Sequence, residues 1–281
     1  MALEEVAQGI HIRRGVDEDV SAANEDAIAN IGFIIGRSGV LVIDPGGSLA
    51  DGERLRAAIA QTTDKPVTHV VMSHVHPDHV FGAGAFLKDS PLFIGHAKLK
   101  EALLQRGAFY RGKLASLLGE DRAGAIIFPH MEVRERTEID LGGRVIAITA
   151  HEPAHTVCDL SLFDQNTGTL LPIDLLFVGR TPALDGSLHG WLKALDELKK
   201  APASRAVPGH GPVAVDWPSG SSAIVRYLSA LKRETKEAIA GGRGLDEAVT
   251  TVAAGERGGW ALFEEYNSRN VAEAFRELEW E

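Results

Sequence analysis

The segment His74-Val75-His76-Pro77-Asp78-His79 places four side chains of metal-ligating type within six residues. It directly follows the apolar run Val67-Thr68-His69-Val70-Val71-Met72, which is typical of a buried strand. A sheet holds the loop at the end of such a strand in a fixed place, and Pro77 stiffens the turn further. Three imidazoles and a carboxylate in one turn offer ligands in two directions, so they suit two adjacent metal ions better than one.

The alternative interpretation of this segment is a solvated, histidine-rich turn that arises by chance among the eleven histidines of the chain. Three further segments argue against chance, because each places a His or an Asp at the end of a predicted strand. These segments are Thr149–Thr156, Leu170–Asp174 and Arg205–Gly211. Strand ends can hold ligands in a fixed geometry while one face stays open to substrate. The pattern therefore predicts a hydrolytic metal site.

The order of these motifs resembles that of the metallo-β-lactamase superfamily of binuclear zinc hydrolases. The likeness covers the His-x-His-x-Asp-His segment, Ala154-His155-Thr156, the strand-ending Asp174 and Gly209-His210-Gly211, and it extends back to Asn30–Ile35 and Ile43–Gly47. The resemblance implies an α/β fold, a four-layer αββα sandwich with C-terminal helices, and a metal-dependent hydrolase.

Other segments are more similar to one group of that superfamily, the quinoprotein relay system zinc metallohydrolases, which are associated with pyrroloquinoline quinone-dependent periplasmic systems. These segments are His76–Gly82, Asp174–Val178, Leu184–Leu188 and the tail Phe275–Trp280. The resemblance therefore also suggests a periplasmic protein.

The superfamily pattern, carried over position by position, implies two sets of ligands. The first zinc would be bound by His74, His76 and His155, and the second by Asp78, His79 and His210. Asp174 matches the carboxylate that bridges both metals in the glyoxalase II and phosphoesterase-like branches. Imidazole and carboxylate suit Zn²⁺, with Mn²⁺ or Fe²⁺ as alternatives. Since zinc lowers the pKa of bound water to about 7, a bridging hydroxide is the expected nucleophile, and Asp78 is the expected catalytic group that accepts its hydrogen bond.

The leading functional hypothesis is hydrolysis of an ester, thioester, lactone or β-lactam carbonyl by this hydroxide. A β-lactamase is a special case that Asp174 disfavours, because the lactamases usually have Cys or Ser at that place. A mononuclear iron sulfur-compound dioxygenase is a second hypothesis, although such an enzyme has little need of Asp78, His79 and His210 together. A third is a non-catalytic metal-binding partner of a quinoprotein system, which would show little turnover.

Residues 97–118 predict helical runs on either side of Arg106–Arg111 that form a lid or a pocket wall over the metal face. Within them Phe109 and Tyr110 are candidate substrate contacts, although aromatic residues at helical spacing are more often part of a core. Arg180 is a candidate for binding a substrate carboxylate, with a surface position as the alternative.

Three other residues lie close to His155 in sequence. Cys158, the single cysteine, is interpreted as a small buried hydrophobe rather than a ligand, because seven ligands are already assigned. His151 and Glu152 either orient the metal-binding imidazoles or belong to a partly exposed strand end.

The composition predicts one large α/β domain over residues 1–281, with 44% hydrophobic and 24% charged residues. A net charge of −10 disfavours nucleic acid as a partner, and no apolar run of membrane-spanning length is present, so a small-molecule substrate is expected. Residues 219–281 predict helices that pack on the sandwich or on a second subunit in a homodimer.

The compartment follows from the resemblance rather than from the cysteine count, since one cysteine fits both the cytoplasm and the periplasm. The acidic start Met1–Val6 is not a leader. We expect a periplasmic protein whose signal peptide has been replaced by Met1, or a cytoplasmic one if Met1 is the natural start.

The apolar patterns locate the main elements around these motifs. Strands are expected near residues 10–14, 30–36, 40–43, 144–149, 159–164 and 169–174, and helices over Ser48–Thr62 with Ser48 as its cap, from Val80 to Leu87, and over Trp191–Lys200.

Overall fold

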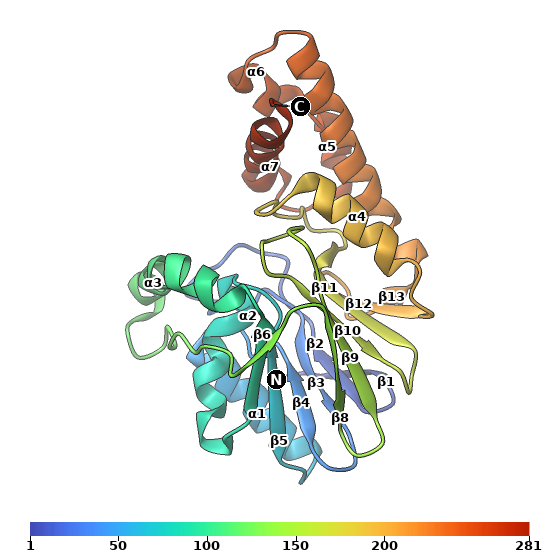
Figure 1. Cartoon of the computed structure of the whole chain (residues 1–281). Coiled ribbons are helices and arrows are strands. Elements are labelled where there is room, and N and C mark those ends of the chain that lie inside the picture. The colour runs from blue at the N-terminus through green and yellow to red at the C-terminus, as the bar shows by residue number, and fades with distance from the viewer. Residues whose placement is uncertain (281) are drawn as a thin grey trace.

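The computed structural model of the protein describes residues 1–280 and has two β-sheets at its centre (Figure 1). The first sheet has the strand order β1 to β7, antiparallel from β1 to β4 and parallel from β4 to β7. Its strands are β1 (Glu4–Ala7), β2 (Ile10–Arg13), β3 (Ile31–Ile35), β4 (Val40–Ile43), β5 (Val67–Met72), β6 (Leu92–His96) and β7 (Met131–Val133).

The second sheet has the order β13-β12-β11-β10-β9-β8, in which only β11 and β12 are parallel. Its strands are β8 (Arg136–Asp140), β9 (Val145–Ala150), β10 (Leu160–Asp164), β11 (Thr169–Phe177), β12 (Arg205–His210) and β13 (Val215–Asp216). β11 is buried along its whole length, as expected for a strand with both faces covered.

The side chains on opposite faces of the strands belong to different apolar clusters, and there are three such clusters among the described residues. On β4, Leu41 and Ile43 join the cluster between the sheets, whereas Val40 and Val42 face the outer cluster beneath α1 (Leu49–Thr62) and α3 (Leu99–Leu118). The third cluster lies on the outer face of the second sheet, under α4 (Leu188–Leu198). The layers therefore run helix, sheet, sheet, helix, and the expected αββα sandwich is confirmed.

The C-terminal helices extend beyond α4, away from the sheets (Figure 1). They are α5 (Ser222–Ala240), α6 (Leu245–Thr251) and α7 (Phe263–Leu278), and they share the apolar cluster of α4 through Trp191, Tyr227 and Phe263. These helices therefore contact α4 of their own chain, and packing on a second subunit in a homodimer stays a prediction. Within residues 1–280 no helix has the length and apolar character needed to cross a bilayer.

Several local predictions can be compared with the structure directly. α1 begins where expected, and the Ser48 hydroxyl accepts a hydrogen bond from the amide of Asp51 at 3.2 Å. The helix expected from Val80 to Leu87 is different: a short α2 (Pro77–Val80) begins earlier, because Pro77 suits the first turn, and a 3₁₀ helix, η1 (Phe81–Asp89), follows it. Residues 106–111 do not interrupt α3, which is one continuous helix.

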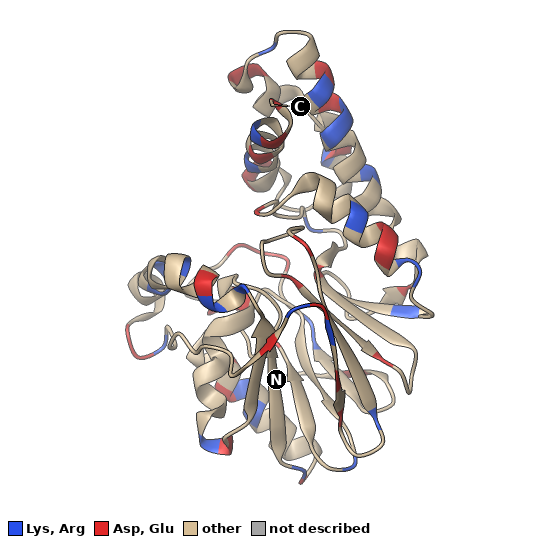
Figure 2. Cartoon of the chain, in the orientation of Figure 1, with Lys and Arg blue, Asp and Glu red and all other residues tan. Residues whose placement is uncertain are grey.

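Charged side chains of both signs are interspersed along α5 and α7 (Figure 2). A protein that follows a nucleic-acid backbone presents a single basic stripe instead. The expectation that nucleic acid is not a partner stays a prediction.

A buried arginine of the second sheet forms an ion pair within that sheet and a hydrogen bond to the first sheet. Arg144, at the start of β9, donates to both carboxylate oxygens of Asp164, with Nη2–Oδ2 at 2.8 Å and Nε–Oδ1 at 3.2 Å. Its Nη1 donates to the carbonyl oxygen of Ile35, on the first sheet, at 2.8 Å. Arg144 is 8% exposed and Asp164 is fully buried, so both charges depend on this pairing.

Substituting Asp164→Ala should therefore lower the free energy of unfolding by about 3–5 kcal/mol, because it leaves the Arg144 guanidinium buried without a counter-charge. Urea denaturation followed by circular dichroism measures this change. Glu138→Ala is the control: its ion pair with Arg136 is largely exposed, and its loss should change stability by less than about 1 kcal/mol. Equal effects of the two substitutions would contradict the role given to the buried pair.

Candidate metal centre

The seven side chains that the sequence predicts as ligands lie together at one edge of the two sheets. The structure arranges them in two groups, within each of which the candidate ligand atoms lie within 4.8 Å of one another. The first group is His74, His76, His155 and Asp174, and the second is Asp78, His79 and His210. Their positions follow from the strands: β5 leads into the His74–His79 turn, β9 precedes His155, β11 contains Asp174 and β12 ends at His210.

The nitrogen atoms of the first group are spaced like metal ligands. His76 Nδ1 lies 3.2 Å from His74 Nε2 and 2.9 Å from His155 Nε2. Ligand atoms at about 2.0–2.1 Å from a tetrahedral zinc ion are separated from each other by about 3.3 Å. The three imidazoles therefore have the separations that a shared divalent ion requires.

Asp174 lies between the two groups. Its Oδ2 is 3.3 Å from His155 Nε2 and 3.3 Å from His210 Nε2, while its Oδ1 is 3.2 Å from His79 Nε2. Asp78 completes the second group, with Oδ2 at 3.4 Å from His79 Nε2 and 3.3 Å from His210 Nε2. One carboxylate thus faces ligand atoms of both groups, as the bridging role implied by the resemblance requires.

Two of these atoms lack a hydrogen bond. His79 Nε2 and Asp174 Oδ1 are buried, and neither has a hydrogen-bond partner within residues 1–280. A buried polar atom without a partner costs about 1–3 kcal/mol. Because the atoms belong to the donor set that divalent ions accept, the residues present fit a pair of such ions.

Comparison with known proteins agrees with this geometry. The family model of the metallo-beta-lactamase superfamily matches residues 25–210, which include all seven candidate ligands. The chain belongs to the metallo-β-lactamase superfamily. The expectation of a superfamily of metal-dependent hydrolases is confirmed at this level, whereas the similarity to the quinoprotein relay group stays a prediction.

Individual relatives of the superfamily are distant. A linear primary-alkylsulfatase from Pseudomonas sp. (strain ATCC 19151) is 24% identical over 243 residues, which cover 72% of this chain and 43% of that protein. The metallo-β-lactamase from Pontibacter korlensis has a TM-score of 0.65 at 18% identity and covers 81% of this chain and 98% of its own. The sec-alkylsulfatase Pisa1 from Pseudomonas sp. has a TM-score of 0.74 at 16% identity, and the likeness covers 98% of this chain and 49% of that protein. The two structural likenesses show the fold, and the chain spans less than half of the curated relative.

The ring nitrogens that point away from the two ligand groups form hydrogen bonds with acceptors elsewhere in the protein. His155 Nδ1 donates to the carbonyl of Ala183 at 2.6 Å, and His210 Nδ1 donates to that of Ile28 at 3.1 Å. His76 is reversed, because its Nδ1 faces the group while its Nε2 lies 3.2 Å from Asp185 Oδ2. Such acceptors fix the tautomer and orientation of a metal-binding imidazole.

Asp44 is a functional residue that the sequence analysis missed. Its Oδ2 accepts from His79 Nδ1 at 2.7 Å and from the Ser73 hydroxyl at 2.8 Å, and that hydroxyl lies 3.0 Å from His74 Nδ1. Asp44 therefore orients one histidine of each group. The sequence does contain a pattern that could have indicated Asp44. It directly follows the apolar strand β4, just as the His74–His79 segment follows β5.

The electrostatics of the cluster favour positive charge at its centre. Burial alone would lower the pKa of His79, but Asp174, Asp78 and Asp44 raise it well above its usual value. Burial opposes ionisation of Asp174, yet His79 and His210 hold its pKa well below the usual range. At His74, burial and the neighbouring His79 lower the pKa. The carboxylates therefore stay ionised beside the imidazoles, as ligands of a cation must.

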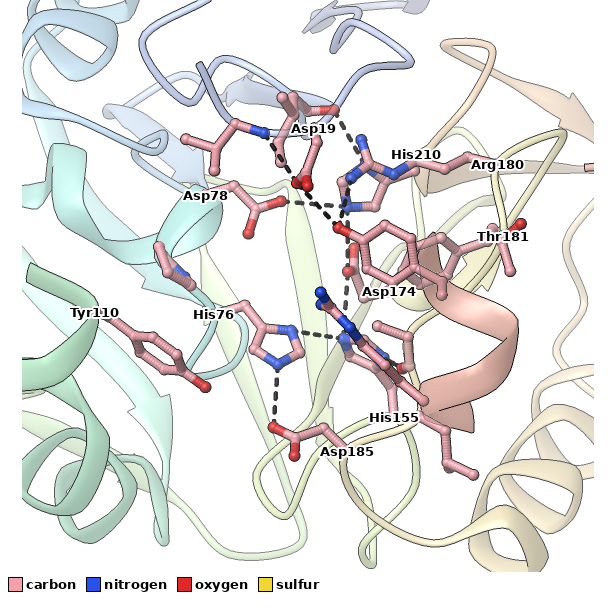
Figure 3. Close-up of a pocket in the computed structure, with 18 of the residues that line it drawn as sticks. Asp19, His76, Asp78, Tyr110, His155, Asp174, Arg180, Thr181, Asp185 and His210 are labelled. Atoms are coloured by element: carbon pink, nitrogen blue, oxygen red, sulfur yellow. Dashed lines mark hydrogen bonds and ion pairs between the residues drawn. The ribbon is translucent and has the colours of Figure 1, made fainter. Parts of the chain in front are cut away.

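A cavity of about 550 Å³ opens over the candidate ligands. Figure 3 shows Tyr110 and Arg180 on different sides of it, around His76, His155, Asp174 and His210. The ring of Tyr110 lies 6.5 Å from that of His76. The cavity therefore has the predicted wall from α3, and Tyr110 is placed where a substrate contact is possible.

The other two predicted substrate contacts are placed differently. Phe109 is 60% exposed on α3 beneath the Lys113 ammonium group and does not line the cavity, because its side chain leaves the helix in another direction from Tyr110. Arg180 lines the cavity and is only 3% exposed, so the surface interpretation is wrong. Its guanidinium donates to the carbonyl of Glu18 at 2.8 Å and to the Tyr266 hydroxyl at 3.4 Å.

Asp26 also lines the cavity and gave no signal in the sequence, since it lies in a polar loop. It is 3% exposed and its Oδ2 has no hydrogen-bond partner within residues 1–280. Burial, together with Asp78 and Asp51, raises the pKa of this carboxyl well above its usual value.

The remaining candidates near His155 are structural. The Cys158 thiol is fully buried in the outer cluster of the first sheet, 3.7 Å from the Thr156 hydroxyl. His151 pairs through Nε2 with the Ser161 hydroxyl at 2.7 Å and not with a candidate ligand.

Asp44→Asn should weaken metal binding by about 10- to 100-fold, because an amide in place of the carboxylate no longer gives His79 a charged acceptor or holds the Ser73 hydroxyl beside His74 in the same way. Competition with a chromophoric chelator measures the affinity. Asp64→Asn, at an exposed position in the loop before β5, is the matched control and should leave the affinity unchanged. An Asp44→Asn protein with the parent affinity would remove Asp44 from the site.

Cys158 should not react with Ellman's reagent in the folded protein. Burial raises the pKa of its thiol to about 12, and no sulfur surface is accessible. One thiol per chain should be released only in denaturant, as the cysteine count requires. Rapid labelling of the native protein would show instead that Cys158 is available to the site.

Proposed function

We propose that the protein is a hydrolase that uses two zinc ions to cleave an ester, thioester, lactone or β-lactam type carbonyl bond. The observation that carries the proposal is the position of Asp174, whose carboxylate faces histidines of both ligand groups at 3.2–3.3 Å. Seven ligands in two groups joined by one carboxylate are more than a single ion requires.

Two bound ions would supply a water of lowered pKa and an electrophilic centre for the substrate carbonyl. The chain supplies the remaining functions. Asp78 lines the cavity and, beyond ligation, accepts a hydrogen bond from the attacking water. Asp44, Asp185 and the carbonyl of Ala183 hold the imidazoles in place, so the ligands do not reorganise as charge develops.

The two other hypotheses have less support. A mononuclear iron dioxygenase does not explain a second group of three buried ligands, Asp78, His79 and His210. A non-catalytic partner of a quinoprotein system does not explain why the ligands face a cavity of about 550 Å³, the size of a small-molecule site. The proposed compartment remains the periplasm, by resemblance.

Sulfate-ester hydrolysis is a second candidate, favoured by one observation. The likeness to Pisa1 covers 98% of this chain, whereas that to the Pontibacter korlensis β-lactamase covers 81%. We therefore include an alkyl sulfate among the substrates to be tested.

Elemental analysis should find about two zinc ions per chain, and turnover should be detected on one member of a panel. The panel holds nitrocefin, a thioester, a lactone, an aryl ester, a phosphodiester and an alkyl sulfate. Asp78→Ala should abolish this turnover because it removes both a ligand and the acceptor for the attacking water.

Asp196→Ala is the control for the same substitution, since Asp196 is exposed on α4, and it should keep full activity. A single iron per chain would favour the dioxygenase. Full zinc occupancy without turnover on any substrate would favour the non-catalytic partner, and both results would reject the proposed hydrolase.

A further inference from the structure

We propose that the cavity above the metal centre binds an apolar chain, so that the substrate is an ester-type compound with a straight alkyl or acyl group. This inference rests on the proposed function and names its substrate class. It comes from the contrast between the floor of the cavity, which holds the polar ligands, and its walls.

The wall formed by α3 is apolar along one side of the helix. Tyr110, Leu114 and Leu117 line the cavity and lie three to four residues apart, on one face. Ile28 and Leu184 add apolar surface from two loops. Five apolar or aromatic side chains from three segments therefore surround the space next to the ligands.

Three polar side chains of the wall are already bonded to the protein, whereas Asp26 Oδ2 has no hydrogen-bond partner within residues 1–280. Asn270 accepts from the amide of Leu184 at 2.9 Å and donates to the carbonyl of Pro182 at 2.6 Å. Asp185 pairs with His76 and with Arg106, and Arg180 binds Glu18 and Tyr266. These groups have little remaining capacity to bind a polar substrate, so the wall offers a ligand mainly apolar contacts.

The mouth of the cavity has apolar side chains beside the exposed charged groups Asp19, Lys113 and Arg269. Val20 and Leu117 both line it, from the N-terminal loop and from α3, and they are 41% and 39% exposed. The cations nearby lie over aromatic rings, Lys113 at 4.6 Å from the centre of Phe109 and Arg269 at 5.6 Å from that of Tyr266. Apolar side chains left open to water beside a deep cavity are typical of a site covered by a ligand.

The energetic consequence is a dependence of affinity on chain length. Each methylene group that leaves water for an apolar wall strengthens binding by about fourfold. A cavity of about 550 Å³ is within the range that encloses most of a small organic ligand, so the gain should continue over several methylene groups and then stop.

Calorimetric titration of the metal-loaded protein with butyrate, hexanoate, octanoate and decanoate tests this inference. The carboxylate head group is the same in all four ligands, so the change in affinity with ligand length reports the contribution of the alkyl chain alone. We expect the dissociation constant to fall by up to about fourfold per methylene group. A dissociation constant that does not change with chain length would overturn the inference.

Two lysine substitutions on α3 test whether the dependence of affinity on alkyl-chain length arises in this cavity. Leu117→Lys places a charge at the mouth and should reduce the gain in affinity per methylene group, so that decanoate binding falls more than butyrate binding. Leu104→Lys is the matched control, because Leu104 is 65% exposed on the same helix and does not line the cavity. If both variants bind decanoate like the parent protein, or if both lose affinity for decanoate equally, the alkyl chain of the ligand does not lie in this cavity.

A series of p-nitrophenyl esters from acetate to decanoate separates this inference from the proposed function. Turnover of the acetate without any gain for longer chains would keep the hydrolase and reject the apolar-chain site. Chain-length-dependent binding without turnover of the panel substrates would reject the hydrolase and keep the site.

Discussion

The structure depends on one constraint: five imidazoles and two carboxylates must be held close together at the edge of a sandwich, six of the seven side chains buried. Burying these ionisable groups destabilises the fold unless imidazoles and carboxylates pair with each other or bind a metal ion. Asp174 is central to the solution, because its two oxygens face histidines from both groups. The sheets fix the strand ends, and the strand ends fix the ligands, so the fold is arranged around this one carboxylate and its neighbours.

The sequence was sufficient for the parts of the site that are local. His74 to His79 and His155 follow an apolar strand and His210 ends one, whereas Asp174 lies within β11, which continues to Phe177, and the prediction that it ends its strand is wrong. The structure nevertheless brings all seven candidate ligands together. Asp44 follows the same rule and was accessible to the same reasoning. The short α2 and the continuous α3 were less predictable, because Pro77 and the helix glycines Gly107 and Gly112 are weak signals for where a helix begins or breaks.

The residues that could not be predicted act over long sequence separations. Asp185 meets His76 across 109 residues, and nothing in the segment around it indicates that partner. Asp26 belongs to the polar loop between β2 and β3, whose place in the cavity depends on its contact with the end of β12 through Ile28 and His210. Burial likewise depends on tertiary packing, which is why Arg180 differs from the surface residue that its polarity suggested.

The C-terminal helices are connected to the ligands through hydrogen bonds rather than through the apolar cluster alone. Glu277 of α7 accepts from the Ser187 hydroxyl at 2.9 Å and from the amides of Leu188 and His189, at the beginning of α4. The amides of Ser187 and Asp185 in turn donate to the carbonyls of Ala154 and His155 at 2.8 and 2.9 Å. We therefore expect the last helix of the chain and the ligand His155 to unfold locally as one unit, so that a substitution near the C-terminus would also disorder the metal site.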